Sequence, residues 1–131
     1  MNILQPPGWA RAKGFSNGIA ASGKLVFIAG QVGWTGEGAW QARDFAGQFK
    51  QALANVLAVL AEAGGKPQDL VRLTWYVLDK REYLNALKPV GEAYRELMGR
   101  HYPTMAVVQV SGLVEDEARL EIEATAVVPE K

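Results

Sequence analysis

Few side chains in this 131-residue sequence could carry out chemistry. There is no cysteine, which excludes a thiolate nucleophile, a disulfide and a cysteine-based metal site. The single histidine, His101, argues against a metal site built by the protein, and we interpret it as a hydrogen-bonded loop residue rather than a titrating group. Ser16 has no predicted histidine base nearby, so the sequence gives little support for a serine nucleophile. Carboxylates remain as the candidates.

Glu121 and Glu123 are the carboxylates of interest. Apolar residues alternate with them from Arg119 to Val128, the pattern of a strand, so both lie on one strand face. A carboxylate that is partly removed from water has a raised pKa and can exchange a proton with water. The alternative is a structural carboxylate, paired with Arg119 on the same face or with a basic residue of another subunit.

The first half of the chain predicts the strands that precede these groups. Residues from Ala12 to Ala21 could form a strand weakened by glycines, and Ser22-Gly23 would turn it into the apolar run Leu25 to Ala29. We expect these two strands to form a β-hairpin. The glycine-rich stretch Gly30 to Gly38 matches no phosphate-binding fingerprint. It is either an ordered loop over a pocket or a simple connection.

Two amphipathic helices and three more strands are predicted after that loop. An apolar stripe spans Asp44 to Ala63, where Gly64-Gly65 ends the helix. A second stripe follows the predicted N-cap Asp79 and ends at Gly99, with a kink or break near Lys88 caused by Pro89. The strands are Val71 to Val77, Met105 to Val110 and Arg119 to Val128.

This ββαβαββ order predicts a single α+β domain over residues 1–131. Right-handed crossovers place both helices on one face of a mixed sheet. The other face would then carry Thr125 and Val127 together with either the Met105, Val107 and Gln109 set or the Ala106, Val108 and Val110 set. Because an uncovered, half-apolar face is typical of an interface, we expect a homo-oligomer.

The composition excludes several partners. Fourteen basic and fourteen acidic residues cancel, so the sequence carries no electrostatic footprint for nucleic acid or an anionic membrane. No apolar run approaches the roughly 20 residues that span a bilayer. The first residues lack the basic and apolar regions of a signal peptide. We therefore expect a soluble, cytoplasmic protein with no nucleic-acid or membrane partner.

Several motifs in this order resemble the Rid family, the reactive intermediate deaminases also called YjgF or endoribonuclease L-PSP-like proteins. They are Gly30-Gln31-Val32, Tyr102-Pro103, Leu120 to Ala124, and an early motif at Phe15 to Ile19. The resemblance covers about Gly14 to Val128. It implies a chorismate-mutase-like fold and a homotrimer with ligand clefts between subunits. It also implies hydrolysis of enamines and imines, such as 2-aminoacrylate, to 2-keto acids and ammonia without a metal or cofactor.

The resemblance also assigns roles to particular positions. The family glutamate that positions the attacking water corresponds to Glu121, which makes it our catalytic candidate. The arginine that clamps the substrate carboxylate corresponds to Met105, and the tyrosine of the early motif corresponds to Phe15. Ala29 and Gly91 stand where the family has a serine and an asparagine. The sequence is thus similar to a divergent member that lacks the substrate-binding arginine.

Met105 changes the expected substrate. Arginine at this position would offer two parallel charge-assisted hydrogen bonds, whereas methionine offers apolar contact. A pocket lined by Met105, Val107 and Phe15 would prefer an apolar or aromatic group, unless Met105 only fills the core. Trp34 could stack on a flat ligand or pack against a neighbouring side chain. Gln31 could reach the ligand or fix the backbone of its own loop.

These observations leave three functions open. The first is an imine or enamine deaminase with an apolar pocket between subunits, in which Glu121 positions water. The second is a non-catalytic trimer that binds small metabolites in its clefts, which accounts for the missing arginine. The third is an endoribonuclease. It has the least support, because neutral charge and a lone histidine offer neither phosphate contacts nor an acid–base pair.

Overall fold

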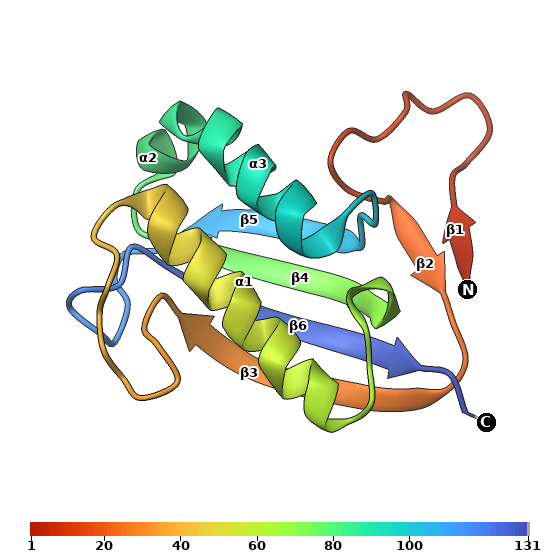
Figure 1. Ribbon diagram of the computed structural model, residues 1–131. Coiled ribbons are helices and arrows are strands. Elements are labelled where there is room, and N and C mark those ends of the chain that lie inside the picture. The colour runs from red at the N-terminus through yellow and green to blue at the C-terminus, as the bar shows by residue number, and fades with distance from the viewer. Residues whose placement is uncertain (131) are drawn as a thin grey trace.

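The computed structural model describes residues 1–130 and contains a four-stranded mixed sheet with helices on one face (Figure 1). The strand order is β3-β6-β4-β5. β6 runs antiparallel to both β3 and β4, whereas β4 and β5 are parallel. This confirms the predicted α+β fold. The sheet strands are β3 (Lys24–Val32), β4 (Leu70–Val77), β5 (Thr104–Gln109) and β6 (Leu120–Val128).

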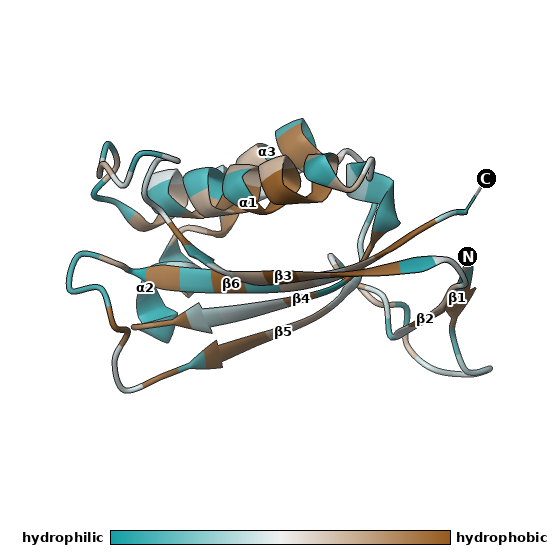
Figure 2. Cartoon of the chain, turned by 90° about the horizontal axis from the view of Figure 1, so that it is seen from below, coloured by the Kyte–Doolittle hydropathy of each residue, from teal (hydrophilic) through white to brown (hydrophobic). Residues whose placement is uncertain are grey.

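Helices α1 and α3 lie side by side on the same face of the sheet (Figure 2). Asp44 caps α1 by accepting a hydrogen bond from the Gly47 N–H, and Ala63 is its C-cap, as the sequence predicts. No helix within residues 1–130 has the length and apolar character needed to cross a membrane. The helical segments are α1 (Phe45–Glu62), the 3-10 turn η1 (Pro67–Asp69), α2 (Lys80–Asn85) and α3 (Leu87–Met98).

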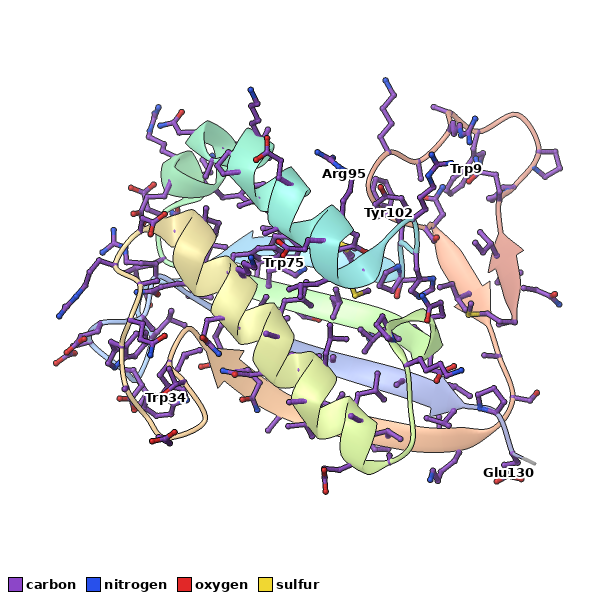
Figure 3. All side chains as sticks on the ribbon, in the orientation of Figure 1. Trp9, Trp34, Trp75, Arg95, Tyr102 and Glu130 are labelled. Atoms are coloured by element: carbon purple, nitrogen blue, oxygen red, sulfur yellow. The ribbon has the colours of Figure 1, made fainter. Side chains whose placement is uncertain are left out.

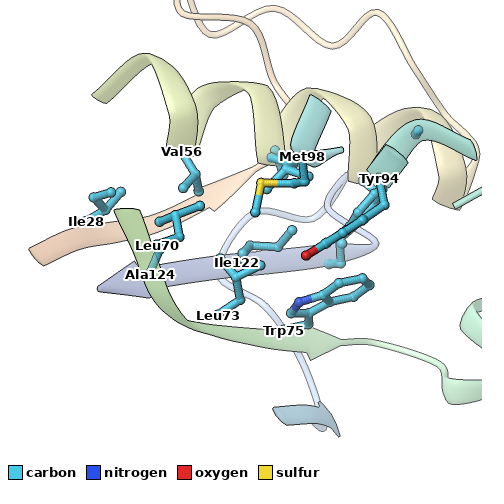
Figure 4. Close-up of a cluster of buried hydrophobic side chains, with 14 of the residues drawn as sticks. Ile28, Val56, Leu70, Leu73, Trp75, Tyr94, Met98, Ile122 and Ala124 are labelled. Carbon is cyan, nitrogen blue, oxygen red and sulfur yellow. The ribbon is translucent and has the colours of Figure 1, made fainter. Parts of the chain in front are cut away.

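The core lies between α1, α3 and the sheet. From α1, Phe49 and Leu53 are fully buried at the predicted helical spacing. From the sheet, Leu73 and Ile122 meet them from adjacent strands and are equally buried. Figure 4 shows this layer continuing toward α3, where Tyr94 and Met98 lie above Trp75. The central strands β4 and β6 are therefore fixed by packing on the helix side.

The predicted hairpin between residues 12–21 and 25–29 is wrong. Only β2 (Gly18–Ala20) forms a strand in the first of these stretches, and it pairs with β1 (Asn2–Leu4) in a separate sheet. Gly14 adopts a φ of 76°, which interrupts an extended strand, and Gly18 lies directly against the Leu4 side chain. The glycines do weaken this strand, as the sequence predicts, and the short strand that remains pairs with β1 instead of β3.

The predicted break near Lys88 is confirmed, and it falls two residues earlier, at Ala86. α2 ends at Asn85, Ala86 caps α3, and Pro89 occupies the third position of α3. Backbone N–H groups in the first turn of a helix have no intrahelical acceptor, so proline costs little there. Pro89 therefore marks the start of a new helix instead of a kink within one.

The face of the sheet away from the helices is not covered by any element within residues 1–130 (Figure 2). Phe27 and Leu25 on β3 are 75% and 61% exposed there. On β5, Met105 and Val107 pack against the core, so Ala106 and Val108 project to this open face. Of the two sets that the sequence allows on the open face, the one that contains Ala106 and Val108 is thus observed.

We expect Leu53→Ala to lower the free energy of unfolding by about 2–5 kcal/mol, because it leaves a cavity in a fully buried layer. Val59, on the same helix, is 41% exposed, and Val59→Ala should change stability by no more than about 0.5 kcal/mol. Urea unfolding at one fixed protein concentration measures both. Equal effects of the two substitutions would contradict this assignment of the core.

Candidate functional site

A cavity of about 200 Å³ lies between α3 and the strands β4 and β5. It contains Met105 and Val107, the two β5 residues expected in the binding pocket. Figure 3 labels three of its other residues, Trp75, Arg95 and Tyr102. The full lining is Gly14, Trp75, Tyr83, Leu87, Val90, Gly91, Tyr94, Arg95, Tyr102, Met105 and Val107.

One wall of this cavity is a stacked pair of tyrosines. The rings of Tyr94 and Tyr102 are nearly parallel, with centroids 5.3 Å apart. The Tyr94 hydroxyl donates a hydrogen bond to the carbonyl oxygen of His101, which fixes the ring. The Nε2 atom of His101 lies 2.7 Å from the carbonyl oxygen of Leu70. These contacts fit the interpretation of His101 as a loop residue that holds the wall in place.

Trp75 forms another part of the same cavity wall. Its ring is 4% exposed and packs between Phe49 and Tyr83, with centroid distances of 4.7 and 5.8 Å. Its indole N–H has no hydrogen-bond partner among residues 1–130. Leaving a buried donor unpaired costs about 1–3 kcal/mol.

Phe15 borders a neighbouring hollow instead of the cavity itself. This second hollow has a volume of about 410 Å³ and is shared by Phe15, Met105, Ser16 and Arg72. Phe15 is 40% exposed. Met105 therefore stands at the boundary between the cavity and the hollow that holds Phe15. The structure brings the predicted apolar residues to the same end of β5.

Glu121 lies on the open face of the sheet. A Cβ atom added to Gly30 would fall 2.2 Å from the Glu121 Oε2 atom, so the carboxylate rests directly over the glycine of the adjacent strand. The proposed pairing with Arg119 is wrong, because Arg119 binds Glu82 with an Nη2–Oε2 distance of 2.7 Å. Glu123 instead accepts a hydrogen bond from the Tyr76 hydroxyl. Glu121 is left without such a partner among the described residues.

Gln31 and Trp34 form a third group, at the other edge of the sheet. They border a hollow of about 320 Å³. Trp34 packs against Trp40 with ring centroids 5.8 Å apart, and its carbonyl oxygen accepts a hydrogen bond from Asn55. The Gln31 side chain donates to the carbonyl oxygen of Ala29. These contacts match the structural alternatives considered for both residues.

One chain does not bring these groups into a single site. Glu121 is on β6 and Met105 is on β5, separated by β4 and out of register by three residues, so their backbones are more than about 10 Å apart. They also project to opposite faces of the sheet. Among residues 1–130, no three histidine, aspartate or glutamate side chains gather in a way that could hold a metal.

Sequence reasoning did not identify Arg95 or Trp75 as part of the cavity. Trp75 was visible only as an apolar position of a strand. Arg95 follows Gly91 by one helical turn, so the two residues share a helix face. This spacing was the available signal, but it does not show that the face lines a cavity.

Comparison with known proteins identifies the family. The endoribonuclease L-PSP family profile matches residues 8–128. The chain belongs to this family, the Rid family. The solved structure of the Rid protein YyfB from Yersinia pestis is 31% identical, with a TM-score of 0.85 over 97% of this chain and 98% of that chain. The predicted family and fold are confirmed.

Two further Rid relatives have names or titles that bear on function. The crystal structure of E. coli TdcF with bound serine is 30% identical, with a TM-score of 0.68 over 98% of this chain and 99% of that chain. A 2-iminobutanoate/2-iminopropanoate deaminase of Salmonella typhimurium is 33% identical over 108 residues, or 80% of each chain. Rid-family relatives of this chain thus include deaminases of small imino acids.

Burial raises the pKa of Tyr94 well above that of free tyrosine, and the adjacent Tyr102 adds to the shift. Because tyrosines of the unfolded chain ionise near pH 10, this linkage keeps its full stabilising effect below that pH. The stability is lost as the pH rises from there toward the folded-state pKa. In an absorbance titration, Tyr94→Phe should remove phenolate signal only from the late phase, at strongly alkaline pH. Loss from the first phase would contradict the assignment.

Proposed function

We propose that this protein is an imine or enamine deaminase that acts in clefts between the subunits of a homotrimer, with Glu121 positioning the attacking water. The observation that carries this proposal is the Glu121 carboxylate, which lies over Gly30 on the uncovered sheet face. Glu121 matches the water-positioning glutamate of the Rid resemblance. The deaminase name of the Salmonella typhimurium relative supports the same reaction class.

Hydrolysis of an imine requires few catalytic groups from the protein. Water attacks the imine carbon, a C–O bond forms, and the C=N bond becomes a single bond. The carboxylate of Glu121 accepts a proton from the attacking water and returns it to nitrogen. The hydroxyl proton of this intermediate then moves to nitrogen as the C–N bond breaks, which gives ammonia and a carbonyl product. Because imines hydrolyse readily in water, orientation and one proton carrier are sufficient, and no metal or cofactor is required.

The homotrimer is supported by the uncovered face. Phe27 and Leu25 expose apolar side chains on this face, level with Thr125 and Val127 of the strand that also carries Glu121. An apolar face on a small domain is typically buried against another subunit. Packing that face against another copy would also remove Glu121 from water and place it close to groups of a neighbouring chain.

We expect a trimer in sedimentation at micromolar concentration. Phe27→Glu should shift it toward the monomer, because association would bury an unpaired charge. Val114 is 93% exposed and lies outside the sheet, so Val114→Glu is a matched control that should leave the mass unchanged. A wild-type monomer, or a Phe27→Glu variant that remains fully trimeric, would rule out assembly through this face.

We expect Glu121→Gln to reduce ammonia release about 100-fold or more, the usual contribution of a positioned proton carrier. The assay uses imines generated in place by an amino-acid oxidase. Glu123→Gln is the matched control on the same strand face and should retain most of the activity. No acceleration by the wild-type protein over buffer, for any imine, would refute the deaminase proposal.

The alternative is a non-catalytic trimer that binds small apolar metabolites. Met105 favours it, since methionine supplies apolar contact and no charge where the family clamp stands. Native mass spectrometry distinguishes the two functions. Retention of an apolar ligand by a protein that hydrolyses no imine would support the binder. Turnover that depends on Glu121 would support the deaminase.

A further inference from the structure

Arg95 is the charged residue in the lining of the 200 Å³ cavity. It extends from α3, on the side where Figure 3 also shows Tyr102. Arg95 makes no ion pair and no side-chain hydrogen bond with residues 1–130, unlike Arg43 and Arg119, which bind glutamates. A guanidinium without an internal anion is available to an external one.

Gly91 leaves the space in which this guanidinium lies. A Cβ atom on Gly91 would lie 3.4 Å from the Arg95 Nη1 atom, and no other atom would come within 4 Å of it. Side chains on a helix lean toward its N-terminus, so Arg95 folds back by one turn over the position that glycine leaves open. The charge is thereby held beside the cavity.

The remaining walls favour an apolar body on the ligand. Met105 and Val107 form one side, and the tyrosine stack and Trp75 form others. An engineered apolar cavity of about 150 Å³ in another protein holds benzene, so about 200 Å³ has room for a ring or a branched aliphatic group.

We propose that Arg95 is the carboxylate-binding residue of this chain, and that its cavity selects carboxylates with an aromatic or branched apolar side chain. In this arrangement the cation stands on α3 instead of on strand β5 at Met105. The part of the inference that concerns 2-imino acids as substrates rests on the proposed deaminase function. The binding of the carboxylate by Arg95 does not depend on it.

Calorimetric titration of the intact protein with 3-phenylpropionate and its neutral amide tests this without turnover. The wild-type protein should bind the acid at least about tenfold more tightly than the amide, the effect of one charge-assisted hydrogen bond. Arg95→Gln should abolish that preference. Arg100→Gln, an exposed arginine outside the cavity lining, is the matched control and should retain it.

Gly91→Leu tests whether the ligand occupies this cavity. Leucine favours the helix over glycine, would project into the cavity and would displace the Arg95 guanidinium, so it should weaken binding of both probes and that of the acid more. Equal wild-type affinity for the two probes, no binding of the acid, a preference retained in Arg95→Gln, or unchanged binding in Gly91→Leu would each overturn the inference. If Arg95→Gln loses the preference while the wild-type protein releases no ammonia from any imine, the inference on Arg95 stands and the deaminase proposal fails.

Discussion

The packing of α1 onto β3 and β6 fixes which residues of these strands face the core, and the rest of the sheet is aligned to them. Phe49 and Leu53 are fully buried against the helix-facing residues of these strands, so the strands can take only one register. Along β6, Leu120 and Ile122 are fixed in the core, and Glu121 between them must project to the opposite face. A slip by one residue would bury the carboxylate and expose the leucine, at a large cost in free energy.

The same alternation divides the functional groups between two faces. Met105 and Val107 belong to the helix side of β5, where they line the cavity, whereas Glu121 belongs to the open side. The cavity that we propose for the substrate and the carboxylate that we propose for water activation are therefore not combined within one subunit. In a trimer, each complete site would be built from two chains. The activity would then depend on the trimer and would be lost when the trimer dissociates on dilution.

Most of the fold could be predicted from the sequence because its strongest signals are local. The stripe of α1 and the glycines after it define that helix without reference to other elements. The short strand Gly18–Ala20 has no such local strength, so its partner is decided by tertiary contacts, which placed it against Asn2–Leu4. The side of β5 that faces the core could not be predicted, because both alternating sets are mainly apolar. The pairing of Leu73 with Met105 decides it.

The candidate site was predicted less completely for a related reason. An arginine on an amphipathic helix normally belongs to the solvent face, and its sequence does not reveal a cavity beside it. The role of Arg95 can be recognised only in the structure, where Gly91, one turn earlier, leaves open a cavity that Met105 and Val107 also line. A charged residue and apolar residues thus line the same cavity, whereas hydrophobic periodicity assigns such residues to opposite faces of a helix.

The attachment of Ser16 to the beginning of β5 has a consequence for solubility. β5 is an edge strand, and an exposed strand edge is a template on which other chains can add. Ser16 forms a parallel bridge with Thr104, its N–H donates to the Pro103 carbonyl oxygen, and its hydroxyl donates to that of Tyr102. These contacts use edge groups that would otherwise be free. The N-terminal segment therefore covers the beginning of the β5 edge, and shortening the chain past Ser16 would leave that part of the edge open to strand exchange.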